Sequence, residues 1–170
     1  MRLPRVRLTV RRMMLAVAVV CVVMAWSLAR QRSERAERYR ELAEFNANYE
    51  RGCVGLISRL EYELAHLGGD STSPAAQDSA RGIEDLLVMA RDNSGERLTA
   101  KDQARRFVHV VPPARIEVLA RQGRGLVAYY SEMGRWYASQ RQAYMLAARS
   151  PWMSVNPGPP PDLYSFVRHE

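Results

Sequence analysis

The chain has 170 residues and a formal net charge of +7, with two Cys and nine Pro. This composition excludes a disulfide-stapled mini-protein, a collagen-like chain and a polytopic membrane protein. The basic character belongs to the first quarter of the chain, because residues 1–40 hold ten Arg and two acids, a balance of +8, whereas residues 41–170 hold 15 basic and 16 acidic residues, a balance of −1.

An uncharged apolar segment, MMLAVAVVCVVMAWSLA, occupies residues 13–29 and follows a basic tail at 1–12. As a helix it is about 25 Å long, near the lower limit for crossing the hydrocarbon core of a bilayer. It is bounded on both sides by arginines that can reach lipid headgroups, namely Arg11, Arg12, Arg30 and Arg32. We predict an uncleaved transmembrane signal anchor. The alternatives are a secretory signal cleaved near Ser27 and Ala29, and a buried core helix.

The arginines around this segment favour one orientation. Five Arg precede it and five follow it, so their number alone does not decide. The short tail before the segment has no acid, whereas the Arg residues after it alternate with Glu. We therefore expect a single-pass protein of the bacterial inner membrane, with the N-terminus in the cytoplasm and the domain outside. If the signal is cleaved, the protein is instead secreted.

After the apolar segment, hydrophobic residues recur at intervals of three and four, as on one face of a helix that extends to about residue 67. They are Leu42, Phe45, Tyr49, Cys53, Leu56, Leu60, Leu64 and Leu67. This helix either continues from the apolar segment as a rigid stalk or begins anew at Ser33. Gly52 and Gly55 predict a kink or a close helix crossing, and Gly68 with Gly69 ends the helix.

The middle of the chain predicts short elements. Residues 68–77 are rich in turn formers and predict a loop, and Asp78 or Ser79 then caps a helix over 79–92. A capped turn at Thr99 leads into another short helix. Residues 107–111 are apolar and are read as a buried connector rather than a strand, because no partner strand is visible elsewhere.

The last long helix is predicted over residues 113–149, opened by Pro112 and Pro113. Its stripe, with heptad spacing, consists of Ile116, Leu119, Gly123, Leu126, Tyr130, Met133, Tyr137, Gln140, Tyr144 and Ala147. We expect this helix to pack antiparallel on 36–67, with 79–92 as a third element. The alternative is an intermolecular coiled coil. The fold class is therefore mainly α: one transmembrane helix, then a small helical bundle or hairpin over 30–149.

The C-terminal tail, residues 150–170, has five Pro within eleven residues and is predicted to be extended. We expect it to lie against its own domain or to stay mobile, with Trp152 packed on the end of the last helix. Binding of the tail to an aromatic-lined domain of another protein is the alternative.

The residues with catalytic potential form no recognisable constellation. Glu63 and His66 have the spacing of half a di-iron site, but a second Glu-x-x-His motif is missing. Cys53 lies on the apolar stripe and is read as a buried thiol, and His109 as a connector residue. Phosphate-binding glycine loops and hydrolase motifs are absent. The near-neutral charge of 41–170 argues against nucleic acid as a partner. We predict no enzyme, no cofactor and no metal.

Both ends of the chain resemble small single-pass membrane-anchored proteins of planctomycete-type bacteria. The resemblance rests on the opening RRMMLAVAVV, on the Tyr-rich last helix, and on its ending from Tyr144 through Pro151 and Trp152 to Pro160. It covers roughly 60 residues and implies a bacterial single-pass protein. It assigns no activity to any residue.

The predicted function is that of a membrane-tethered structural or protein-interaction module. Its partners are the lipid bilayer and either another protein or a second copy of the chain. The predicted packing or interaction stripe consists of Leu56, Leu60, Leu126, Tyr130, Met133 and Tyr137. The alternative is an extracytoplasmic ligand-binding or sensory domain with an aromatic pocket near the last three of these residues.

Overall fold

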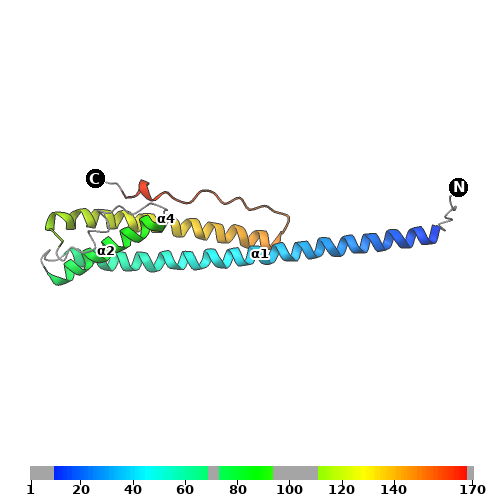
Figure 1. Ribbon diagram of the computed structural model, residues 1–170, viewed down its shortest axis with the longest axis horizontal. Coiled ribbons are helices and arrows are strands. Elements are labelled where there is room, and N and C mark those ends of the chain that lie inside the picture. The colour runs from blue at the N-terminus through cyan, green and yellow to red at the C-terminus, as the bar shows by residue number, and fades with distance from the viewer. Residues whose placement is uncertain (1–9, 69–72, 94–110, 168–170) are drawn as a thin grey trace, which may run out of the picture.

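The computed structural model describes residues 10–68, 73–93 and 111–167. These residues form three α-helices and one short 3₁₀ helix, without a strand among them (Figure 1): α1 Val10–Leu67, α2 Pro74–Asn93, α4 Pro113–Arg149 and η1 Leu163–Ser165. The mainly α fold is confirmed. The short helix expected after Thr99 and all but the last residue of the 107–111 connector lie outside the described residues.

Helix α1 joins the apolar segment and the amphipathic stalk in one continuous helix of 58 residues, about 87 Å long at 1.5 Å per residue. The alternative of a new helix at Ser33 is wrong, because Ser33 Oγ donates to Arg30 O at 2.8 Å inside the helix. The apolar segment is long and apolar enough to cross a membrane, and none of it is buried by the rest of the chain. It therefore fits a membrane anchor or a signal sequence and is not a core helix.

Gly52 and Gly55 do not mark the kink or the close crossing that the sequence suggested. Both are exposed, and a Cβ atom added to either would meet nothing within 4 Å. Figure 1 shows α1 passing through this region without a sharp bend. The helix stays regular because its hydrogen bonds do not depend on the side chain, and the two glycines only weaken its propensity.

Helix α2 begins at Pro74, five residues before the predicted start, so the predicted loop is wrong over 74–77, and so are the caps at Asp78 and Ser79. Residues 69–72 of that loop lie outside the described residues. The cap is Ser73, whose Oγ accepts a hydrogen bond from Ala76 N at 3.2 Å. Pro is favoured in the first turn of a helix, where its missing N–H costs nothing, and the Ala residues that follow are strong helix formers.

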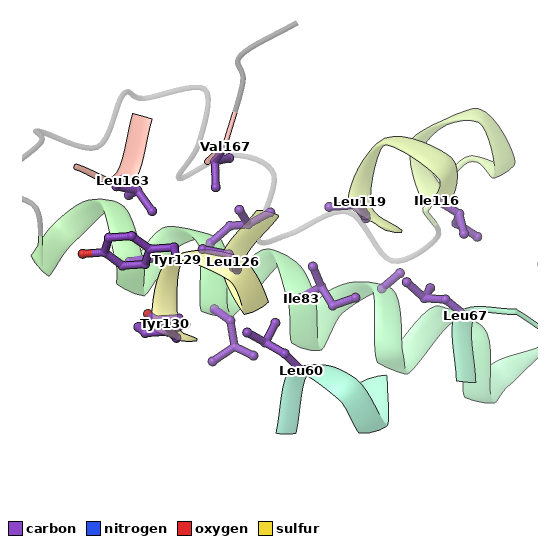
Figure 2. Packing of buried hydrophobic residues seen from close by; sticks show 14 of the residues in the cluster. Leu60, Leu67, Ile83, Ile116, Leu119, Leu126, Tyr129, Tyr130, Leu163 and Val167 are labelled. Carbon is purple, nitrogen blue, oxygen red and sulfur yellow. The ribbon is translucent and has the colours of Figure 1, made fainter. Parts of the chain in front are cut away.

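Helix α4 has the predicted bounds and packs antiparallel along α1, with α2 beside both at the end far from the N-terminus (Figure 1). The intramolecular packing is therefore confirmed. Its centre is an apolar cluster in which Leu60, Ile83, Leu119 and Leu126 are almost or fully inaccessible to solvent (Figure 2). Full burial of such a side chain contributes about 1.5–3 kcal/mol, so this cluster holds the three helices together.

The first half of the predicted α1 stripe is wrong. Leu42, Phe45 and Tyr49 are 41%, 54% and 47% exposed, whereas Ala43 and Asn46 are each 6% exposed. The buried face of α1 in this region carries small or polar side chains, and the buried amide of Asn46 is satisfied because its Nδ2 donates to Leu42 O at 2.6 Å. In this half of α1 the hydrophobic repeat therefore marks a face of the helix that lies next to the buried face. From Cys53 onward the predicted stripe does face the core.

The Pro-rich tail leaves α4 and runs back along it as an extended segment, as predicted (Figure 1). Trp136 Nε1 donates to Gly158 O at 3.1 Å, and Leu163 and Val167 are buried. The tail therefore lies against its own domain. The prediction for Trp152 is wrong: this side chain is 70% exposed and is therefore not packed on the end of α4.

Candidate binding pocket

A cavity of about 550 Å³ lies between α1, α2 and α4, within the size range of small-molecule sites. Its lining is aromatic and uncharged: Asn48, Tyr49, Gly52, Cys53, Leu56, Ala90, Tyr129, Tyr130, Met133 and Tyr137. One wall of the pocket is formed by α1 and the opposite wall by α4. In each helix the lining residues recur at helical spacing on one face, so the antiparallel packing of the two helices brings the walls together.

Gly52 contributes to this pocket by having no side chain. A Cβ atom at this position would meet nothing within 4 Å, so the space beside the α1 backbone stays open to the cavity. At the neighbouring crossing point the helices are close, since a Cβ on Gly134 would lie 3.6 Å from Cys53 Cβ. This close approach lies at the edge of the pocket, because Cys53 also belongs to its lining.

The tyrosine rings contact one another across and along the walls. Tyr49 of α1 and Tyr137 of α4 have ring centroids 5.1 Å apart, and Tyr129 meets Tyr130 edge-on at 5.2 Å. Tyr129 also lies 6.1 Å from the ring of Phe166 in the tail. Contacts at these distances stabilise aromatic pairs beyond their buried area. The walls are thus held in place before any ligand arrives.

Burial favours the neutral form of four ionisable groups of the pocket, namely Cys53, Tyr129, Tyr130 and Tyr137. Burial raises the pKa of Tyr130 to about 12, and burial also raises the pKa of Tyr129 and of Tyr137. Burial likewise raises the pKa of the Cys53 thiol, which makes it a poor nucleophile. The phenol hydroxyls can therefore donate hydrogen bonds, and the rings offer apolar faces. This combination suits a neutral, largely apolar ligand that carries hydrogen-bond acceptors.

The predicted stripe residues divide between the core and the pocket. Leu60 and Leu126 are fully buried and Tyr130 is 6% exposed, so these three contact other parts of the same chain. Leu56, Met133 and Tyr137 are partly buried and line the pocket, together with Tyr130. All six side chains are buried or partly buried within the domain, so they leave little exposed surface for a partner protein.

The predicted membrane-flanking arginines all lie on α1. Arg11 is in its first turn, and Arg12, Arg30 and Arg32 are exposed. Arg30 Nε lies 3.0 Å from Glu34 Oε1, one helical turn away. None of these residues contributes to the pocket.

Cys53 is buried, as predicted. His66 is exposed on the surface of α1, with its ring centroid 4.2 Å from that of Tyr62 and its Nδ1 2.8 Å from Tyr62 O. Within the described part of the chain, no group of three or more His, Cys, Asp or Glu side chains is placed to hold a metal ion. His109 lies outside the described residues.

The sequence predicts a pocket near Tyr130, Met133 and Tyr137, but it does not identify the other residues of the lining. Those are Asn48, Tyr49, Gly52, Cys53, Leu56, Ala90 and Tyr129. A usable signal was present in α1. There a large side chain, Tyr49, is followed three residues later by Gly52, which has no side chain, and then by the small Cys53. Such a sequence indicates a hollow on the helix surface once another helix is known to pack over it.

No known protein family matches this chain, no curated protein is significantly similar to it in sequence, and no solved structure matches its fold. The pocket and the apolar segment are therefore interpreted from their own chemistry, and the resemblance to planctomycete-type proteins stays a prediction.

Proposed function

We propose that the protein is a single-pass membrane protein of the bacterial inner membrane whose extracytoplasmic domain binds a small, neutral, largely apolar ligand. The carrying observation is the pocket of about 550 Å³ with its four tyrosines and no charged lining residue. A ligand with aromatic or aliphatic surface and a few hydrogen-bond acceptors matches that lining best, because an ionised ligand would find no counter-charge there.

The membrane part of the proposal is supported by the apolar segment and the basic residues on both sides of it. Helix α1 connects this segment to the pocket without interruption. From Arg30 to Cys53 the helix rises about 35 Å, so the pocket stands well clear of the headgroups. The bracing of α1 by α4 along much of that length keeps the pocket at a fixed height.

Gly52 offers a direct test. Gly52→Leu puts a side chain into the open space beside the pocket without meeting another atom at its Cβ. Gly55→Leu is the matched control, because it makes the same change on the same exposed helix, also meets nothing within 4 Å, and lies outside the pocket lining. Both substitutions replace a helical glycine and raise helix propensity, so neither is expected to unfold the domain.

The measurement is a thermal-shift screen of the detergent-solubilised full chain against neutral aromatic and aliphatic metabolites. We expect at least one compound class to raise the melting temperature of the wild type and of Gly55→Leu, but not that of Gly52→Leu. Equal shifts in both variants would place binding elsewhere. A screen in which no compound stabilises the wild type would count against a ligand-binding role.

A second candidate function, protein interaction, is favoured by one exposed surface. Leu42 and Phe45 are exposed on α1, at 41% and 54%, and the ring of Phe45 lies 4.5 Å from that of the pocket residue Tyr49. Under this proposal a partner protein or a second copy covers that surface. Phe45→Ser should then abolish capture of the partner, or self-association, in a pull-down from solubilised membranes. A pull-down in which wild type and variant behave alike would exclude this surface.

A further inference from the structure

Four large apolar side chains are exposed together where α4 ends and the tail begins. Met145, Leu146, Trp152 and Met153 are each at least half exposed, and Trp152 is the most exposed of them at 70%. They flank a compact turn in which Ser150 N donates to Leu146 O and Met153 N donates to Ser150 O. We call these four residues the proximal turn. Such a concentration of exposed apolar surface usually marks a contact with a partner or a membrane.

The proximal turn lies at the end of the helical hairpin nearest the apolar segment. Figure 1 shows the chain reversing there, beside the point where α1 leaves the bundle towards the N-terminus. Tyr39 of α1 fixes this position: its hydroxyl donates to Met153 O at 3.1 Å, and its ring stacks on Tyr144 with centroids 6.1 Å apart. The turn is thus attached to α1 ten residues beyond Ala29, the last residue of the apolar segment.

The height of the turn above the bilayer follows from helix geometry. Ten residues rise about 15 Å, of which the headgroup layer on one side covers about 5–8 Å. With helix axes about 8–10 Å apart, an ordinary tilt of about 20° towards α4 lowers the turn by about 3 Å. The remaining few ångströms are within reach of extended Trp and Met side chains.

The surroundings of the proximal turn match a headgroup layer. Arg35, Arg38 and Arg40 of α1 and Arg149 at the end of α4 are exposed in this region, where Glu37 and Glu41 are exposed as well, so basic residues are in excess. Indole rings favour the membrane–water interface, and an excess of arginine is attracted to anionic lipids. An apolar surface with a net positive charge around it, tethered this close to the apolar segment, therefore fits a lipid surface better than a soluble partner.

We propose that the proximal turn is a second membrane contact, which enters the headgroup layer of the same bilayer that holds residues 13–29. The rod formed by α1 and α4 then meets the membrane at two places and keeps a fixed tilt, which fixes the direction in which the pocket opens. This inference rests on the membrane anchoring proposed above.

The three tryptophans of the chain allow a test, because each lies at a different distance from the proposed bilayer. Three variants of the full chain each keep a single Trp, the other two being replaced by Phe: Trp26 in the apolar segment, Trp136 on the rod, and Trp152 in the turn. Each is reconstituted in vesicles of phosphatidylcholine and phosphatidylglycerol, with or without acyl chains brominated near the headgroup. Circular dichroism confirms that each variant keeps its helix content.

We expect the brominated lipids to quench the fluorescence of Trp26 and of Trp152 and to leave that of Trp136 unchanged. Quenching of Trp26 without quenching of Trp152 would overturn the second contact and leave the anchor standing. Absence of quenching at Trp26 would overturn the anchor, and the second contact with it. Equal quenching at Trp136 and Trp152 would show that the whole rod lies on the bilayer, which also contradicts the proposal.

Discussion

Gly125 is the position at which a single methyl group should detach the tail. A Cβ atom added there would lie 2.4 Å from Phe166 O and 3.2 Å from Phe166 C. Both atoms belong to the backbone, so no side-chain rotation relieves the overlap. Gly125→Ala must therefore push the end of the tail away from α4.

The magnitude follows from what the tail buries. Leu163 and Val167 are 5% and 3% exposed, and burial of each contributes about 1.5–3 kcal/mol. Complete release of the tail therefore costs at most about 3–6 kcal/mol, whereas a partial shift with overpacking costs about 1–3 kcal/mol. Alanine recovers about 1 kcal/mol through its helix propensity. We expect a net destabilisation of about 2 kcal/mol.

Gly55→Ala is the matched control, because it gains the same propensity and its Cβ meets nothing within 4 Å. It should be about 1 kcal/mol more stable than the wild type. The two variants then differ by about 3 kcal/mol, or about 6–12 °C in melting temperature. Thermal unfolding of the full chain in detergent measures this difference, and chymotrypsin cleavage at Tyr164 reports release of the tail. A Gly125→Ala variant as stable as Gly55→Ala, with its tail still protected, would refute this account of the packing.

Three further predictions concern the core, a helix cap and pH. Leu60→Ala removes a side chain that is 0% exposed and should lower the free energy of unfolding by about 2–5 kcal/mol in urea titrations. Ser73→Ala removes the hydrogen bond to Ala76 N and should cost about 0.5–2 kcal/mol in the same assay. Burial raises the pKa of Tyr130 from 10 to about 12, so above pH 10 the unfolded chain loses a proton that the folded chain keeps. Stability should therefore fall between pH 10 and 12, and titrations at several pH values should show a smaller fall for Tyr130→Phe.

Where the chain contains strong local signals, the sequence predicts the fold well. The bounds of α4 were predicted correctly, because Pro112 and Pro113 open the helix and Pro151 follows its end. The start of α2 was misplaced because Pro74 was read as part of a loop, although Pro is also favourable in the first helical turn. The sequence around Pro74 is compatible with a loop and with the start of a helix. The hydrogen bond from Ala76 N to Ser73 Oγ, which is seen only in the structure, shows that the helix starts there.

Periodicity alone was less reliable for choosing a face. Leu42, Phe45 and Tyr49 repeat as regularly as a buried stripe, yet each is more than 40% exposed, whereas Ala43 and Asn46 are buried. Tyr49 lies at the border between the two faces, since its ring still contacts that of Tyr137 in α4. Hydrophobicity favours the aromatic face, whereas close approach of two long helices favours small side chains. The second effect prevails at the end of the hairpin nearest the apolar segment, and a single sequence does not show which helix covers which face.

The pocket, too, could be predicted only in part from the sequence. Its α4 wall was predicted from Tyr130, Met133 and Tyr137, but the opposite wall comes from residues about 80 positions earlier, and their register against α4 depends on packing along the whole hairpin. Two glycines show where this register brings other parts of the chain close to a helix or leaves space beside it. The sequence predicts a kink or a close helix crossing at Gly52, and Gly125 within the last long helix argues against a free-standing coiled coil. In the structure Gly52 leaves open space beside the pocket, and Gly125 leaves room for the backbone of the tail, which a Cβ atom would overlap. Each glycine costs its helix about 1 kcal/mol of propensity relative to Ala.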